Sequence, residues 1–392
     1  MATCEHHVLV ITRLFVILGA LLLGSAARGA EEDDVGRAVQ VLHDTYGDQL
    51  GDTDLFRAAL DGIARELDRT VGRPGHAVVD AKDRAKVERW LDGHRHGIAA
   101  EFAIVPGQGI VITDVYAGGP AERAGLQVGD LVVALDDRPF TGLSADFILA
   151  IASEIQSREV VLDVRRPEGL RRIPISRGPW RLDTARAFDH HGVTVLKLPF
   201  FGPGSARAVA HALEPHPDNA PLVIDLRTNE GGRLEAMVEV ASLFVPKGRP
   251  IVMVDSGQGE PTTHSARAAV SIPGPGPVVI LVDRDTSGTA EAFAAALRHE
   301  AHAVIVGSPT AGRDGLPRWV PVGDHLFLRV MADQLRDPTG STWAGSGVVP
   351  DILSQPVSRP MPVQPGQLPP DVQLDVAAQV AGRAGVQSAT DH

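Results

Sequence analysis

Apolar and polar residues follow three successive patterns along the chain and divide it into three structured regions. Residues 31–93 carry apolar side chains at helical spacing, which predicts a helical N-terminal region. Residues 94–178 contain short apolar runs broken by glycine and one amphipathic stretch at residues 144–156. This pattern predicts a small β-rich domain, a partly open barrel with one helix.

The third region, residues 179–355, alternates between strand-like and helix-like runs. The strand-like runs are residues 193–200, 222–227, 278–284 and 303–307, and the helix-like runs are residues 205–213, 234–244 and 290–300. Such alternation predicts βα units around a mostly parallel sheet. Residues 356–392 contain six prolines, all within residues 356–370, and predict an extended strap followed by a short helix at residues 371–381. The expected fold class is therefore multidomain α/β.

Composition excludes some classes of function. A formal net charge of -12 over 392 residues argues against a nucleic-acid partner, because phosphate binding needs a dense cationic surface. The 15 histidines are scattered without the spacing of metal ligands, so we expect no metal site and no cofactor.

The N-terminus has the pattern of a secretory signal peptide. An apolar run at residues 14–23 follows the basic Arg13, and the small residues Ser25 and Ala27 favour cleavage after residue 27. We therefore expect residues 1–27 to be a signal peptide and the mature protein to be periplasmic or otherwise extracytoplasmic. If Val8–Thr12 extend the apolar run, the alternative is an uncleaved segment that anchors the protein to the membrane.

The segment AGGPAERAGLQVGDLVVALDDRPF, at residues 117–140, carries a specific signature in the second region. It resembles the G-S-P-A-x-x-A-G-L-x-x-G-D-x-I motif of bacterial PDZ domains, which implies a PDZ domain over residues 94–178. PDZ domains bind peptide C-termini as an added edge strand and hold the carboxylate with backbone N–H groups. The resemblance implies that this loop is Gly97, Ile98, Ala99 and Ala100, with Ala99 where the family usually has a second glycine.

Four further motifs occur in order in residues 179–355: VTVLKLPFF, PLVIDLRTNEGGRLEAMVEVASLFVP, VVILVDRDTSGTAEAFAAALRHEAHAVIVGSPTAGRDG and RDPTGSTWAGSGVVPDI. Together they resemble the core of carboxyl-terminal processing (tail-specific) serine proteases. The resemblance implies an α/β tail-specific protease-like core, related to crotonase-like folds. It also implies that the loop containing Gly231 and Gly232 helps to form an oxyanion hole.

The resemblance also implies that the catalytic residues have been replaced. Aligned on Glu291, the family's serine nucleophile corresponds to Gly288, and its lysine base corresponds to Arg313. The separation of 25 residues between them equals the family's serine-to-lysine spacing. A supporting glutamine of many members corresponds to Pro317. Glycine has no nucleophile, and arginine keeps its proton because its pKa exceeds about 12.

An alternative is an active serine endopeptidase that removes C-terminal segments and uses Ser287 with a base foreign to the family. His299 and His302 are candidate bases only because they lie nearby in sequence. The main hypothesis is an exported pseudoprotease that binds peptide or protein C-termini without cutting them. Its expected partners are an active protease or an envelope protein.

Overall fold

The computed structural model describes residues 33–46, 52–144, 146–148, 157–182, 185–267, 272–274, 276–323, 325–355 and 362–390. The expected signal peptide lies outside these residues. None of the described helices combines the length and apolarity that crossing a membrane requires. The chain divides into two compact units, Met1–Ala85 with Gly315–Asp333 and Lys86–Asp314 with Gln334–His392.

The first unit is mainly helical. It contains α2 (Asp33–Tyr46), α3 (Asp52–Val71), β1 (Ala77–Asp80), the start of α4 (Ala81–Leu91), β17 (Gly315–Pro321) and part of β18 (Leu326–Arg336). The predicted helices are present, but β1 interrupts them and pairs antiparallel with β18, with Val78 opposite Leu328. The sequence pattern missed this strand because β1 has only four residues and its partner is remote in sequence.

The PDZ-like region of the second unit is a six-stranded antiparallel sheet. Its elements are β3 (Ala100–Val105), β4 (Gly109–Val115), α5 (Pro120–Arg123), β5 (Leu131–Leu135), β6 (Arg138–Pro139), β7 (Glu159–Arg166) and β8 (Gly169–Ser176). The strand order β3-β4-β5-β7-β8 leaves β3 at one edge and β8 at the other. Phe140 and Ile148 are fully buried in the core beneath the sheet. Of the predicted helix at residues 144–156, residues 146–148 are described, and they are helical.

The protease-like core has the predicted parallel sheet. Its strands are β10 (Arg186–His190), β11 (Val193–Lys197), β12 (Leu222–Asp225), β15 (Val278–Val282), β16 (Val304–Gly307) and β19 (Ile352–Leu353), in that spatial order. All neighbours are parallel except the pair β10–β11. Strands buried on both faces read as continuous apolar runs, which is why these strands were predictable.

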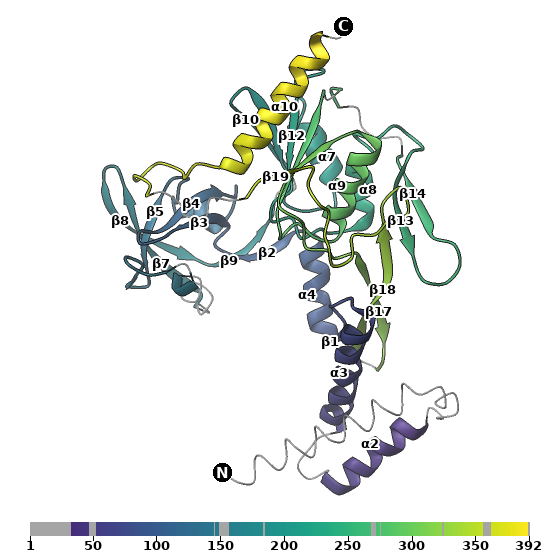
Figure 1. Cartoon of the computed structure of the whole chain (residues 1–392). Coiled ribbons are helices and arrows are strands. Elements are labelled where there is room, and N and C mark those ends of the chain that lie inside the picture. Colours follow the sequence, from purple (N-terminus) through teal and green to yellow (C-terminus); the bar gives the residue numbers. More distant parts are fainter. Residues whose placement is uncertain are drawn as a thin grey trace. The chain divides into compact units, whose positions relative to one another are not determined.

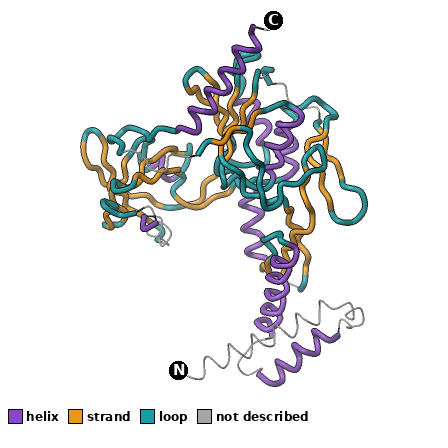
Figure 2. The backbone as a smooth tube through the Cα atoms, in the orientation of Figure 1, coloured by secondary structure: helices purple, strands orange, loops and turns teal. Residues whose placement is uncertain are grey.

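Helices cover both faces of this sheet (Figure 1). On one side lie α7 (Ser205–Ala212), α8 (Leu234–Ala241) and α9 (Thr289–Glu300), and on the other lies α10 (Val372–Thr390), as the helix colouring of Figure 2 also shows. Leu374, Ala377 and Ala381 of α10 are buried against Val195 and Leu281 of the sheet. The C-terminal helix is therefore part of the core and is longer than the sequence predicted.

Shorter strands complete the second unit: β2 (His94–Gly97) pairs with β9 (Gly178–Arg181), and β13 (Pro250–Asp255) pairs with β14 (Thr262–Ser265) and with the end of β18.

The start of α10 is fixed by a half-buried arginine. Arg227 donates to both carboxylate oxygens of Asp371, at 2.8 and 2.7 Å, and also pairs with Asp225. Burial alone would raise the pKa of Asp371, but Arg227 holds it below its usual value.

The described part of the strap, residues 362–371, has no regular secondary structure and contacts the PDZ-like region. Val363 packs on Val105 and Leu131, and its backbone exchanges two hydrogen bonds with the side chain of Gln108. The predicted extended strap is thus tied to the PDZ-like region.

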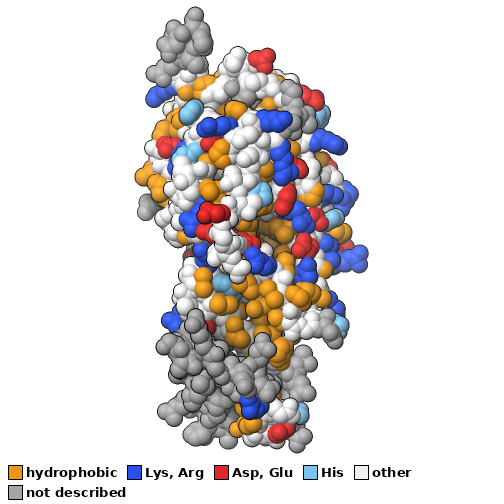
Figure 3. All heavy atoms as spheres, turned by 90° about the vertical axis from the view of Figure 1, so that its right-hand side faces the viewer, with side chains coloured by type: hydrophobic (Ala, Val, Ile, Leu, Met, Phe, Trp, Pro, Cys, Tyr) orange, Lys and Arg blue, Asp and Glu red, His pale blue; other side chains and the backbone are white. Residues whose placement is uncertain are grey.

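Figure 3 shows one face of the molecule, on which acidic and basic side chains are interspersed. The described acidic residues form no single-sign patch on that face. A surface with charges of both signs interspersed favours solubility.

Candidate functional site

The turn between β15 and α9 carries the predicted nucleophile position. The five residues of β15 are buried, and the chain then turns at Asp283, whose Oδ1 accepts the N–H groups of Asp285 and Thr286 at 3.0 and 2.9 Å. The Thr286 hydroxyl donates to the carbonyl of Leu226 at 2.9 Å. These bonds fix a tight strand-to-helix turn, and α9 begins immediately after Gly288.

Gly288 has a backbone conformation that other residues rarely adopt, with φ 62° and ψ -121°. A Cβ atom there would have room, since its nearest neighbour would be the Glu230 carbonyl oxygen at 3.8 Å. A strained strand-to-helix turn of this kind is how α/β-hydrolases expose a serine nucleophile. The turn therefore keeps space for a reactive side chain, but glycine supplies none.

Glu291 joins this turn to the loop of the predicted base. Its side chain is fully buried and accepts four hydrogen bonds: from the hydroxyl of Thr310 at 2.5 Å, and from the N–H groups of Gly312, Arg313 and Gly288 at 2.7, 2.9 and 2.9 Å. Burial raises the pKa of Glu291 although the four bonds favour its charged form. Gly288 and Arg313 donate to the same oxygen, so the structure brings the two predicted positions together.

The side-chain environment of Arg313 does not suit a general base. A lysine base must be neutral, and burial is what lowers its pKa far enough. Arg313 is exposed, and its guanidinium keeps its proton in any case. Pro317 lies on β17 in the other compact unit, exposed, and offers neither a side-chain polar group nor an N–H.

Ser287 is buried, at 3% exposure, and its N–H donates to the Asn229 carbonyl at 2.9 Å. Its two candidate bases lie elsewhere. His299 is near the other end of α9, about 15 Å along the helix axis, and pairs there with Asp337 at 3.2 Å. His302 is exposed beyond the end of the same helix. The structure does not bring either histidine to Ser287.

The Gly231–Gly232 loop lies against the start of α9. A Cβ at Gly231 would approach the Thr289 hydroxyl oxygen to 2.9 Å, and one at Gly232 would meet the Phe201 carbonyl oxygen at 2.1 Å, so both positions require glycine. Asn229 orients the loop by accepting the Gly231 N–H at 2.8 Å.

Two backbone N–H groups lie where this loop meets the start of α9, those of Gly232 and Thr289. Neither has an acceptor among the described residues. The Thr289 hydroxyl oxygen is buried beside them and, within the described chain, also lacks a partner. Unpaired donors at a helix start suit an oxygen ligand with partial or full negative charge. The sequence alone indicated no role for Thr289, and it identified Glu291 only as the residue on which the family motif aligns.

The predicted carboxylate loop leads into the edge strand β3. The carbonyls of Ile98 and Ala99 accept the N–H groups of Ala121 and Tyr116 at 2.7 and 3.0 Å, whereas the N–H groups of Ile98 and Ala99 have no acceptor among the described residues. Ala99 keeps a left-handed φ of 66°, and Gly119 makes room for its methyl group. Alanine has thus replaced the expected glycine in a backbone conformation that glycine would adopt without strain.

Ion pairs connect this edge strand and its neighbour β4, which carries Asp114, to the protease-like core. Lys197 on β11 binds Glu101 on β3 at 2.5 Å, and Arg186 on β10 binds both oxygens of the nearly buried Asp114 carboxylate at 3.0 and 2.9 Å. Glu101 of β3 thus contacts the core sheet directly, through Lys197.

Comparison with known proteins gives two family matches. The model of peptidase family S41 matches residues 192–354, and the model of the PDZ domain matches residues 111–166. A "Probable CtpA-like serine protease" of Staphylococcus aureus (strain MRSA252) is 24% identical over 353 residues, which cover 88% of this chain and 70% of that protein.

Two solved structures share the fold. The photosystem II D1 C-terminal processing protease has a TM-score of 0.50 and 24% identity, covering 87% of this chain and 90% of its own. A structure described as a putative S41 protease from Bacteroides fragilis NCTC 9343 has a TM-score of 0.58 and 14% identity, covering 83% of this chain and 90% of its own.

Proposed function

The chain belongs to the tail-specific proteases of peptidase family S41 that carry a PDZ domain, and from this premise we propose that it binds the C-terminal ends of peptides or proteins without cutting them. The proposal rests mainly on one observation. Gly288 occupies the strand-to-helix turn that corresponds to the family's serine nucleophile. Acyl transfer needs both a nucleophile and a base, and Arg313 cannot serve as the base. The protein then acts as an adaptor, or as a decoy or regulator for an active protease.

The free edge of β3 supports peptide binding. An extended peptide can pair with β3 as an added strand, and its terminal carboxylate can accept the unpaired N–H groups of Ile98 and Ala99. Phe102 on β3 is exposed at 42%, so an apolar C-terminal side chain would find an apolar partner on this strand. We therefore propose ligands that end in an apolar residue with a free carboxylate.

This predicts that a peptide with a free, apolar C-terminus binds at least about tenfold more tightly than its amidated form, because the amide loses charge-assisted hydrogen bonds. Phe102→Glu should weaken binding of the free peptide by a similar factor, through lost apolar contact and repulsion of the carboxylate. Fluorescence anisotropy with labelled peptides measures both effects.

The matched control is Leu170→Glu, which adds the same charge at an exposed apolar residue on β8, at the opposite edge of the sheet. It should leave affinity unchanged. Equal affinity for the free and amidated peptides would refute carboxylate recognition, and equal losses in the two variants would refute the β3 edge as the binding site.

We also propose that the protein is exported. The apolar run at residues 14–23 and the small residues that follow it predict a mature chain beginning at Arg28. N-terminal sequencing of protein recovered from the periplasmic fraction of an expressing bacterium should read from that residue. Recovery of soluble periplasmic protein that still begins at Met1 would contradict signal-peptide cleavage.

A further inference from the structure

Two histidines and an aspartate meet on the surface of the core domain, away from the site described above. His190 is the last residue of β10, His191 lies in the turn to β11, and Asp375 lies in the first turn of α10. The Nε2 atoms of His190 and His191 are 2.8 and 3.6 Å from the same carboxylate oxygen of Asp375. His190 and Asp375 are separated by 185 positions in the sequence, so only the fold reveals the cluster.

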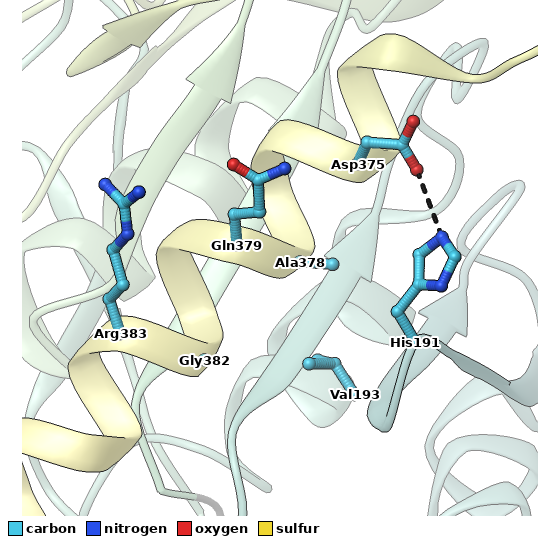
Figure 4. A pocket seen from close by; sticks show the side chains of 7 residues that line it. All are labelled: His191, Val193, Asp375, Ala378, Gln379, Gly382 and Arg383. Carbon is cyan, nitrogen blue, oxygen red and sulfur yellow. Dashed lines mark ion pairs between the residues drawn. The ribbon is translucent and has the colours of Figure 1, made fainter.

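The hairpin turn directs His191 toward α10. His191 and Gly192 have φ values of 55° and 81°, the left-handed pair that a two-residue type I′ turn requires. The first of these positions usually holds asparagine, aspartate or glycine, and a histidine there accepts backbone strain. Figure 4 shows the His191 ring turned toward the carboxylate of Asp375.

The position of Asp375 is equally well defined. Leu374, Ala377 and Ala378 on either side of it are buried against the parallel sheet, which holds the first turns of α10 in place. The backbone N–H of Asp375 donates to the Asp371 carbonyl at 2.9 Å. Two separately anchored elements therefore present the three side chains to one another.

We propose that His190, His191 and Asp375 bind a divalent transition-metal ion, with zinc as the best match. One ligand atom of each residue lies within 4.8 Å of the others. Tetrahedral zinc with bonds of about 2.0–2.2 Å places its ligand atoms about 3.3–3.6 Å apart, so changes of roughly an ångström in the separations of these atoms would complete the site. Two imidazoles and one carboxylate suit zinc, and also nickel or copper, rather than calcium or magnesium.

The fourth coordination position would face a groove. A cavity of about 870 Å³ beside His191 is also lined by Gln379 and Arg383 of α10, both visible in Figure 4. His191 is 76% exposed at its side chain, so water or an external ligand can reach an ion held there. Because the ligands come from β10, the β10–β11 turn and α10, a bound ion would cross-link the C-terminal helix to the edge of the sheet.

The test uses tag-free protein, since an added histidine tag would bind the same metals. Isothermal titration with zinc should show one site per chain, and cobalt added in its place should give the visible absorption of a tetrahedral complex. His191→Asn keeps a residue that tolerates the left-handed turn but removes a ligand, and should weaken binding by at least tenfold. Zinc should also raise the Tm of the wild type and leave that of His191→Asn nearly unchanged.

The matched control is His211→Asn, which removes an exposed histidine that pairs only with Glu214, at 3.2 Å, among the interactions described for it. It should bind zinc like the wild type. Circular dichroism without metal should be the same for all three proteins, which separates loss of the site from loss of fold. Absence of zinc binding at millimolar concentration, or wild-type affinity in His191→Asn, would overturn the proposal.

Discussion

Replacing Glu291 with alanine should lower the free energy of unfolding by about 3 kcal/mol or more, since each buried donor left unsatisfied costs about 1–3 kcal/mol. The fully buried carboxylate accepts four hydrogen bonds, and three of their donors are backbone N–H groups that cannot turn toward another acceptor. The turn at Gly288 and the loop at Arg313 would lose the group that joins them. Urea denaturation followed by circular dichroism measures the change.

The control is Glu235→Ala, which removes an exposed acidic residue from the first turn of the neighbouring helix α8. Only the small effect of a charge near a helix start, about 0.3–1 kcal/mol, is expected there. Similar losses in the two variants would mean that the four bonds to Glu291 contribute little and that it does not organise the site.

The second prediction is that a double variant gains reactivity toward a serine-directed probe. The double variant Gly288→Ser, Arg313→Lys should react with a serine-directed phosphonate probe, whereas each single variant stays at the background level, because nucleophile and base act as a unit. The turn has room for the serine Cβ, although its left-handed φ should cost about 1–3 kcal/mol of stability. The N–H groups of Gly232 and Thr289 remain to receive the oxyanion.

The pH profile identifies the base. Position 313 is exposed, so a lysine there should keep a pKa near about 10.4 and be mostly protonated at neutral pH. Labelling of the double variant should therefore rise about tenfold per pH unit between pH 7 and 9. Equal labelling of Gly288→Ser alone, or a flat profile for the double variant, would show that residue 313 is not the base position.

The sequence predicted those parts of the fold that local patterns determine. β12, β15 and β16 are continuous apolar runs because both faces of a parallel sheet are covered by helices. The glycine-rich motif at residues 117–140 predicted a PDZ domain, and within it α5 is followed by a turn at Gly125, which has a left-handed φ of 80°. The spacing between Gly288 and Arg313 predicted a pair that the structure brings to one carboxylate oxygen.

Features that depend on residues remote in sequence could not be predicted. β1 is too short to show a period, and its register with β18 exists only in the folded chain. The four hydrogen bonds to Glu291 come from the turn between β15 and α9 and from the loop that follows β16. A single sequence does not show that these two segments meet at one side chain. Likewise, His190 and His191 carry no metal-ligand spacing, and Asp375 joins them only because α10 packs on the sheet.

We propose that this protein has no serine nucleophile in use. The most direct test is intact-mass analysis after incubation with a fluorophosphonate probe, applied to the wild type, Ser287→Ala and the double variant Gly288→Ser, Arg313→Lys under the same conditions. We expect no adduct on the wild type or on Ser287→Ala, and one adduct on the double variant. A single adduct on the wild type that disappears in Ser287→Ala would contradict it and identify an active serine peptidase that uses Ser287.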